Sequence, residues 1–173
     1  LSKVTDLLYR ISDAAASQDF ALTKDLLAQL RQRHVNLACE LLEQNPVQKE
    51  SAVGRVNAIC DELDALANAV CAVGELSDRN KAIIISNGEL LSSTIICFAM
   101  NAKGIRTNWI DARKMMVTND AYLKGEPVES EIVSRVPGMI AEAYEGMDAV
   151  ITQGFIAWNM KGEQTVLGRG GSD

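Results

Sequence analysis

The residues with the clearest chemical potential lie at the end of the chain, in the run Leu167-Gly168-Arg169-Gly170-Gly171-Ser172-Asp173. Its three glycines let backbone N–H groups turn toward an anion without a side-chain clash. The guanidinium of Arg169 can grip a carboxylate with two parallel hydrogen bonds. Ser172 and Asp173 are favoured at helix starts, so a strand, a glycine loop and a helix start are expected here. This order forms a cradle for phosphate or carboxylate, although an ordinary turn or a glycine-rich tail fits the pattern equally well.

Three further segments contain residues that can bind a ligand. Glu89, in Ser86-Asn87-Gly88-Glu89-Leu90-Leu91-Ser92-Ser93, can pair with an ammonium group, or it can simply be a solvated residue near a helix start. Gln153-Gly154-Phe155 follows an expected strand, where Gly154 permits an unusual turn. Asp111-Ala112-Arg113 contains opposite charges that can also pair with each other at the surface.

The sequence gives little support to histidine, disulfide or metal chemistry. His34 is the only histidine, and it lies in a helical pattern that indicates a packing or helix-surface role. The four cysteines form no CxxC pair and are expected to be buried reduced thiols, at positions Cys39, Cys60, Cys71 and Cys97. We assign no metal ligand.

The composition is that of an ordinary folded protein with a mildly acidic character. Hydrophobic residues make up 47% of the 173 residues and charged residues 23%, which argues against disorder. The formal net charge of −6 disfavours nucleic acid and anionic membranes as partners. The chain lacks the run of about 18 apolar residues that spans a bilayer and the basic and apolar regions of a signal peptide. A cytoplasmic location is expected.

Helical periodicity dominates the first hundred residues. Apolar residues recur at helical spacing in the segments 4–11, 19–44 and 50–73, and Asn45-Pro46 separates the second from the third. Residues 82–85 fit a buried strand, but a helix through 89–102 that ends before Gly104 is preferred. Taken alone, this region indicates a helical module for binding or oligomerisation.

The pattern changes after Gly104. Strands are expected at 105–110 and 148–152, with a helix at 131–145 between them that is interrupted near Pro137-Gly138. Two further strands at 155–158 and 164–167 flank a hairpin turn. Alternation of helices and strands predicts an α/β sandwich.

Five segments, taken in order, resemble motifs of the aspartate kinases, which are members of the amino acid kinase family. They are Ser2-Lys3-Val4-Thr5-Asp6-Leu7-Leu8, Gly88-Glu89-Leu90-Leu91-Ser92-Ser93, Trp109-Ile110-Asp111-Ala112-Arg113 with Thr118-Asn119-Asp120, Ile151-Thr152-Gln153-Gly154-Phe155-Ile156, and Leu167-Gly168-Arg169-Gly170-Gly171-Ser172-Asp173. Each segment alone is a moderate signal. The ordered set spans almost the whole chain and is far more specific than a single glycine pattern.

The resemblance implies a three-layer αβα sandwich of the amino acid kinase type, with a mainly parallel sheet and a helical subregion at 19–103. It implies that residues 1–173 are a partial catalytic domain that holds aspartate and is inactive alone. The ATP-binding half and the ACT regulatory domains are expected to be missing from this chain. The parent enzyme, expected to be a homo-oligomer, would use ATP and Mg²⁺ to phosphorylate the side-chain carboxylate of L-aspartate. The product, 4-phospho-L-aspartate, leads to lysine, threonine and methionine.

The resemblance also assigns roles to individual residues. The aspartate-binding residues would be Thr5, Glu89, Phe155, Arg169 and Ser172. Ser172 and Asp173 would be catalytic at the phosphoryl end of the site, and the cofactor-binding glycines would be Gly168, Gly170 and Gly171. Glu89 would pair with the α-ammonium group and Arg169 with the α-carboxylate. Because a carboxylate nucleophile is already ionised, alignment and charge neutralisation suffice, and no histidine base is needed.

Some family features are missing or altered. The Lys-Phe-Gly-Gly-Thr-Ser segment that precedes the first motif in relatives has no counterpart, and Ser93 replaces a common threonine. The helical region, including Leu76-Ser77, also resembles enzymes fused to homoserine dehydrogenase. A kinase acting on glutamate, N-acetylglutamate or carbamate is an alternative, although an acetylated amine offers Glu89 no positive charge.

Overall fold

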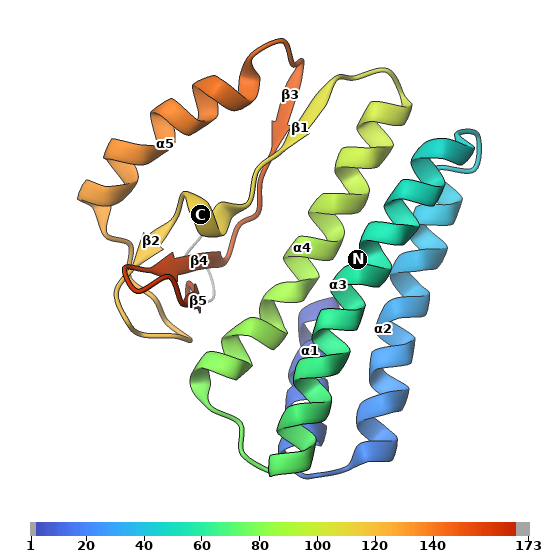
Figure 1. The fold of residues 1–173 in the computed structure, drawn as a ribbon, viewed down its shortest axis with the longest axis vertical. Coiled ribbons are helices and arrows are strands. Elements are labelled where there is room, and N and C mark those ends of the chain that lie inside the picture. Colours follow the sequence, from blue (N-terminus) through green and yellow to red (C-terminus); the bar gives the residue numbers. More distant parts are fainter. Residues whose placement is uncertain (1–2, 169–173) are drawn as a thin grey trace.

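Four long helices form the first part of the fold in the computed structural model, which describes residues 3–168 (Figure 1). Their packing partners place α2 beside α1 and α3, and α4 beside α1 and α3. The helices are α1 (Val4–Ala16), α2 (Phe20–Leu41), α3 (Pro46–Val73) and α4 (Asp78–Ala102). The predicted break between the two middle helices is confirmed.

Polar caps mark the starts of three of these helices. The side chains of Asp19, Asn45 and Ser77 each accept a hydrogen bond from the backbone N–H three residues later, which replaces a partner missing at a helix start. Pro46 follows Asn45 in the first turn of α3, where its missing N–H costs nothing. Gly74 ends α3 with a φ of 74°, a conformation that glycine adopts without strain.

Helix α4 is the central element of the described structure. It packs against α1 and α3 on one side and against strands β1 and β5 on the other. Ile84, Leu91 and Ile95 on this helix are fully buried. The segment 82–85 belongs to this helix and is not a strand. The helix expected at 89–102 is confirmed, but it begins earlier, at Asp78.

By length and composition alone, α4 could cross a membrane. Half of its most apolar window is buried inside the fold, however, and the core helix of a soluble protein meets the same criteria. Its buried side chains also include Ser86, Asn87 and Ser93, all of which make hydrogen bonds within the protein. A single helix of this kind is weak evidence for a membrane span.

The second part of the fold contains short strands and one further helix. These elements are β1 (Thr107–Trp109), the 3₁₀ turn η1 (Ala112–Lys114), β2 (Val117–Thr118), α5 (Glu129–Tyr144), β3 (Ala149–Ile151), β4 (Ile156–Asn159) and β5 (Gln164–Val166). Strands β1 and β3 are parallel and lie between α4 and α5 (Figure 1). Strand β4 is parallel to β2 and antiparallel to β5, so the predicted hairpin is confirmed.

The structure corrects two expectations. Residues 3–168 form two small sheets, β1-β3 and β2-β4-β5, rather than one mainly parallel sheet, because no strand pair joins the two groups. The fold is thus an α/β arrangement of helices with small sheets, and a full three-layer sandwich stays a prediction. Helix α5 also continues through Pro137. The carbonyl that loses its partner there belongs to Val133, a 64% exposed residue that water can reach.

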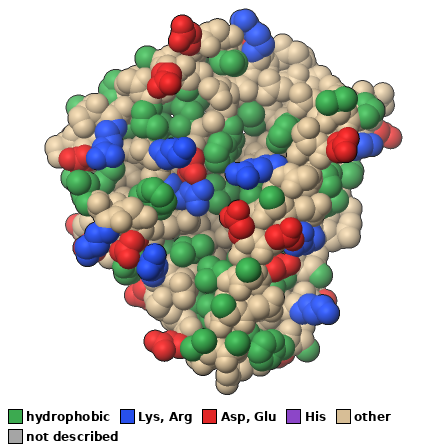
Figure 2. Space-filling view, in the orientation of Figure 1, with side chains coloured by type: hydrophobic (Ala, Val, Ile, Leu, Met, Phe, Trp, Pro, Cys, Tyr) green, Lys and Arg blue, Asp and Glu red, His purple; other side chains and the backbone are tan. Residues whose placement is uncertain are grey.

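Acidic and basic side chains are interspersed on the face drawn in Figure 2. Several ion pairs lie at the surface, such as Arg106 with Asp148, whose side chains are 65% and 44% exposed. Exposed pairs of this kind contribute little to stability, because water and salt screen their attraction.

Candidate functional site

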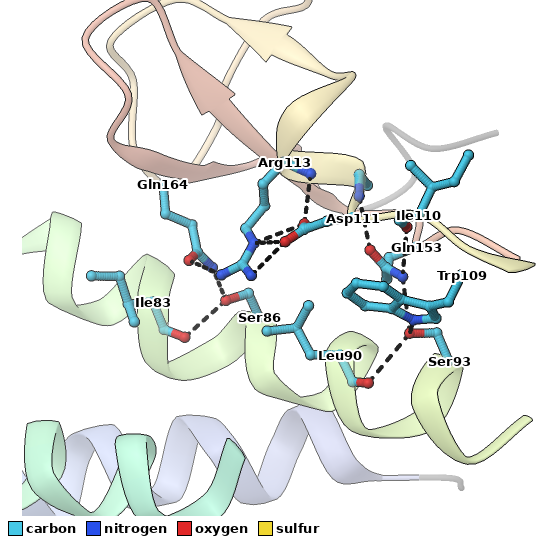
Figure 3. Close-up of polar contacts among 11 residues, drawn as sticks. Ile83, Ser86, Leu90, Ser93, Trp109, Ile110, Asp111, Arg113, Gln153 and Gln164 are labelled. Atoms are coloured by element: carbon cyan, nitrogen blue, oxygen red, sulfur yellow. Dashed lines mark hydrogen bonds and ion pairs between the residues drawn. The ribbon is translucent and has the colours of Figure 1, made fainter. Parts of the chain in front are cut away.

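The site is organised by one face of α4. Ser86, Glu89 and Ser93 are spaced by three and four residues and therefore share a face of the helix. The hydroxyl of Ser86 accepts a hydrogen bond from Gln164 on β5, and that of Ser93 accepts one from the Trp109 indole at 2.9 Å (Figure 3). Glu89 thus lies between two polar contacts that join α4 to the strands.

Gln153 links the loop after β3 to this helix face. Its amide nitrogen donates hydrogen bonds to the Ser93 hydroxyl at 3.0 Å and to the Ile110 carbonyl at 3.2 Å. Its amide oxygen accepts a hydrogen bond from the Ala112 N–H at 2.9 Å. Although Gln153 is only 6% exposed, its polar atoms are therefore well satisfied.

Arg113 forms a second polar link between the elements around the site. It pairs with Asp111 through two guanidinium nitrogens, at 2.8 and 2.6 Å, and donates to the Gln164 side chain at 3.1 Å. Burial by itself would raise the pKa of Asp111, but the hydrogen bonds and charge of Arg113 outweigh it and lower that pKa. The expectation that these two residues pair is confirmed, and the pair is half-buried rather than fully exposed.

Glu89 is half-buried, and its side chain has no hydrogen bond or ion pair with any residue in 3–168. Burial raises the pKa of its carboxyl group, because a charged group loses hydration there. A carboxylate of this kind favours a cationic ligand that restores the lost interactions. The chemistry fits the predicted pairing with an ammonium group.

Close packing at Gly88 brings the first turn of α1 to the same place. A Cβ atom at Gly88 would lie 3.1 Å from Val4 Cγ1 and 3.2 Å from Leu8 Cδ1, so only glycine allows this approach without displacement. Thr5 follows Val4 and Glu89 follows Gly88. The crossing of α1 and α4 therefore brings together the neighbourhoods of two predicted aspartate-binding residues.

Phe155 adopts a backbone conformation that is unusual for its residue type. Its φ of 68° lies in the left-handed region, which costs a bulky residue about 1 kcal/mol or more. Its carbonyl accepts a hydrogen bond from the Leu167 N–H at 2.8 Å, so the loop lies beside the end of β5 and Gly168. Non-glycine residues in this conformation often occur at functional sites.

Thr5 and Glu89 follow the residues that meet where α1 contacts α4, and Phe155 lies beside the end of β5, next to Gly168. Their union in one aspartate site stays a prediction. The other predicted site residues, Arg169, Gly170, Gly171, Ser172 and Asp173, lie outside the described residues. Gly168 is the last described residue, and its predicted role in phosphate binding stays a prediction. Gln153 and Ser93 lie within the candidate segments of the sequence, but neither was assigned a role of its own, and Gln164 was expected only as a strand residue. The signal available was a glutamine placed directly between a strand and a glycine turn.

The histidine and two of the four cysteines follow expectation. His34 is fully buried, its Nδ1 lies 2.7 Å from the Leu30 carbonyl, and burial lowers its pKa, which fits a packing role. The cysteines are free; two are buried and one is partly buried, whereas Cys39 is exposed, contrary to the prediction of a buried thiol. Cys39 lies outside the buried stripe of α2 that contains Leu30, His34 and Ala38, which accounts for its exposure. Residues 3–168 contain no group of three or more His, Cys, Asp or Glu side chains able to hold a metal.

No protein-family model matches the chain, but known proteins that are similar to it are aspartokinases or contain one. The lysine-sensitive aspartokinase 3 of Escherichia coli is 32% identical over 127 residues, which are 68% of this chain and 27% of that protein. The aspartokinase of Chlamydia muridarum is 30% identical over 98% of this chain and 34% of its own length. A bifunctional aspartokinase/homoserine dehydrogenase of Zea mays is 26% identical over the whole chain, which corresponds to 18% of that protein.

Solved structures agree at the level of the fold. Escherichia coli aspartokinase III, in complex with aspartate and ADP, matches 99% of this chain with a TM-score of 0.83 and 24% identity. The match covers 36% of that structure. Clostridium acetobutylicum aspartate kinase matches 98% of this chain with a TM-score of 0.64 and 18% identity.

The relatives show that this chain belongs to the aspartokinase family, and the solved structures show the same α/β fold. The homologues of this chain are aspartokinases, alone or joined to homoserine dehydrogenase, so the resemblance seen in the sequence is confirmed. The chain spans about a fifth to a third of the length of these relatives.

Proposed function

We propose that the protein containing this chain is an aspartokinase, and that this chain forms its aspartate-binding part. The observation that carries the proposal is the half-buried carboxylate of Glu89, which has no partner among residues 3–168. It lies on the helix face between the contacts to Gln153 and Gln164, and next to the crossing with α1. Aspartokinase homologues and a related structure that holds aspartate and ADP support the same substrate class.

The proposed reaction transfers the γ-phosphoryl group of ATP to the side-chain carboxylate of L-aspartate. Glu89 would bind the α-ammonium group and Arg169 the α-carboxylate, which leaves the side-chain carboxylate free to attack. An oxygen of this carboxylate forms the new bond to phosphorus, the bond to the bridging oxygen breaks, and ADP leaves. No proton has to be removed from the nucleophile, because it is ionised at neutral pH.

The phosphate end of the site is proposed to lie at the segment that begins with Gly168. Gly170 and Gly171 would present N–H groups to phosphate oxygens, and Ser172 and Asp173 would organise the transferring group. Mg²⁺ would accompany the phosphates of ATP and neutralise their charge.

The finer architecture and setting belong to the same proposal. Residues 1–173 would be part of an αβα sandwich whose ATP-binding half and ACT domains lie elsewhere in the protein. The enzyme would be a cytoplasmic homo-oligomer that supplies lysine, threonine and methionine synthesis. We expect residues 1–173 alone to be inactive, because the nucleotide-binding half is required.

Acyl-phosphate formation by the full-length protein tests the proposal. The protein is incubated with ATP, Mg²⁺ and one candidate acid, and hydroxylamine traps any acyl phosphate as a hydroxamate. We expect product with L-aspartate and none with glutamate, N-acetylglutamate or carbamate. Product with another acid only would replace the substrate, and a folded protein without product would favour a non-catalytic helical module instead.

A further inference from the structure

The Ser93 hydroxyl has every hydrogen-bonding direction in use. It accepts hydrogen bonds from the indole nitrogen of Trp109 at 2.9 Å and from the Gln153 amide at 3.0 Å. It also donates to the Leu90 carbonyl at 3.3 Å, within its own helix (Figure 3). A hydroxyl group has one donor and two acceptor directions, so its orientation is fixed.

The Gln153 amide is equally constrained. Both N–H groups are used, toward Ser93 and the Ile110 carbonyl, and the oxygen receives the Ala112 N–H. The reversed amide would place its oxygen against the Ile110 carbonyl and its nitrogen against the Ala112 N–H, so the contacts allow only one orientation. The pair therefore joins α4, the end of β1 and the loop after β3 at one point.

This junction lies between the two parts of the proposed aspartate site. Ser93 follows Glu89 by four residues, one turn further along α4, whereas Gln153 precedes Phe155 by two residues. The hydrogen bond between Ser93 and Gln153 is thus a short direct link between the ammonium-binding carboxylate and the strained loop. Phe155 holds its positive φ in a loop whose position depends on the three hydrogen bonds of Gln153.

We propose that Gln153 and Ser93 are positioning residues that set the distance between Glu89 and the loop at Phe155, an inference that rests on the proposed function. Neither residue needs to touch the substrate. Without their hydrogen bond, α4 and the loop can move apart, and the two sides of the site no longer grip aspartate together. Displacements of about 1 Å at an active site can lower rates by as much as about 100-fold.

Asn101 provides a matched control on the same helix. Its amide also joins α4 to β1, through a donated bond to the Thr107 carbonyl at 2.8 Å and an accepted bond from the Thr107 N–H at 3.1 Å. It lies three helical turns beyond Glu89, at the other end of the strand contact. A role in stability alone would make Asn101 and Gln153 equivalent.

Steady-state kinetics of the full-length protein test the inference with Ser93→Ala, Ser93→Thr, Gln153→Met and Asn101→Leu. We expect Ser93→Ala and Gln153→Met to raise KM for aspartate by about tenfold and to leave KM for ATP unchanged. Ser93→Thr keeps the hydroxyl and should retain the original KM for aspartate. Asn101→Leu should lower the melting temperature without changing that KM.

Each contrary result has a defined meaning. An unchanged aspartate KM in Ser93→Ala would overturn the positioning role, as would an equal rise in Asn101→Leu or failure of Ser93→Thr to restore binding. The Ser93 variants decide the question even if Gln153→Met does not fold. Absence of aspartate-dependent acyl-phosphate formation in the unaltered protein would instead refute the proposed function, and with it the substrate assigned to these residues.

Discussion

Replacement of Glu89 by glutamine should weaken aspartate binding more than any other isosteric change on α4. The substitution keeps the shape of the side chain and removes its charge. Loss of one partner of a buried charge pair costs about 2–5 kcal/mol, and the half-burial of Glu89 favours the lower end of that range. A loss of about 2 kcal/mol corresponds to a weakening of about 30-fold in aspartate affinity.

A thermodynamic cycle with succinate isolates this interaction, since succinate is aspartate without its amino group. Inhibition constants are measured for succinate, and affinities for aspartate, in the original protein and in Glu89→Gln. We expect removal of the amino group to be costly in the original protein and nearly neutral in the variant, with a coupling energy of about 2 kcal/mol. Glu62→Gln, at an exposed position on α3, should change neither value. A coupling energy near zero would refute the pairing of Glu89 with the ammonium group.

The same variant should behave differently in a stability assay without ligand. The folded-state pKa of Glu89 is raised by burial, so its protonated form is favoured by folding. Its contribution to stability is present below the usual glutamate pKa of about 4.3 and is lost as the pH rises through the raised pKa. We therefore expect Glu89→Gln to be at least as stable as the original protein at pH 7. Clear destabilisation there would show that Glu89 has a structural partner.

Three further substitutions test the packing around the site. Gly88→Ala should fail to stabilise α4, because the new methyl group meets α1 at 3.1 Å. Gly54→Ala in α3 has open space, so its free energy of unfolding, measured by chemical denaturation, should rise by up to about 1 kcal/mol. Equal gains in the two variants would contradict the close approach at Gly88. Phe155→Gly should be about 1 kcal/mol more stable than Phe155→Ala, because only glycine adopts a positive φ freely, and the reverse order would argue against this backbone conformation. Asp111→Asn should lower stability at neutral pH and reduce the loss of stability on acidification. Because the pKa of Asp111 is lowered in the folded state, its ionised carboxylate stabilises the fold above the usual aspartate pKa, and this stabilisation is lost as the pH falls through the folded-state pKa. A pH–stability profile unchanged from the original protein would contradict the pairing with Arg113.

The helical half of the fold could be predicted from the sequence because its signals are local. Apolar residues at helical spacing and caps such as Asn45 and Ser77 depend only on neighbours in the chain. The run Ile83-Ile84-Ile85 was ambiguous because a helix buried on two sides and a buried strand have the same apolar pattern. Division of the strands into two small sheets depends on pairing between distant segments, which a local pattern does not encode.

The candidate site likewise combines residues that local motifs indicate with contacts between distant segments that they do not. Glu89 and Phe155 are predicted site residues because motifs that resemble a known family contain them. The contact between Gln153 and Ser93 could not be predicted, because their hydrogen bond joins residues 60 positions apart in the chain. The positive φ of Phe155 was also unpredictable, since the glycine beside it was the residue expected to adopt an unusual conformation.

The position of the phosphoryl group on the product tests the central claim most directly. The full-length protein is incubated with ATP, Mg²⁺ and L-aspartate, and borohydride then reduces any acyl phosphate to an alcohol. If Glu89 holds the ammonium group and the side-chain carboxylate attacks ATP, the reduced product is homoserine. Formation of 3-amino-4-hydroxybutanoate would mean that the α-carboxylate is phosphorylated, and the absence of either alcohol would contradict aspartate kinase activity itself.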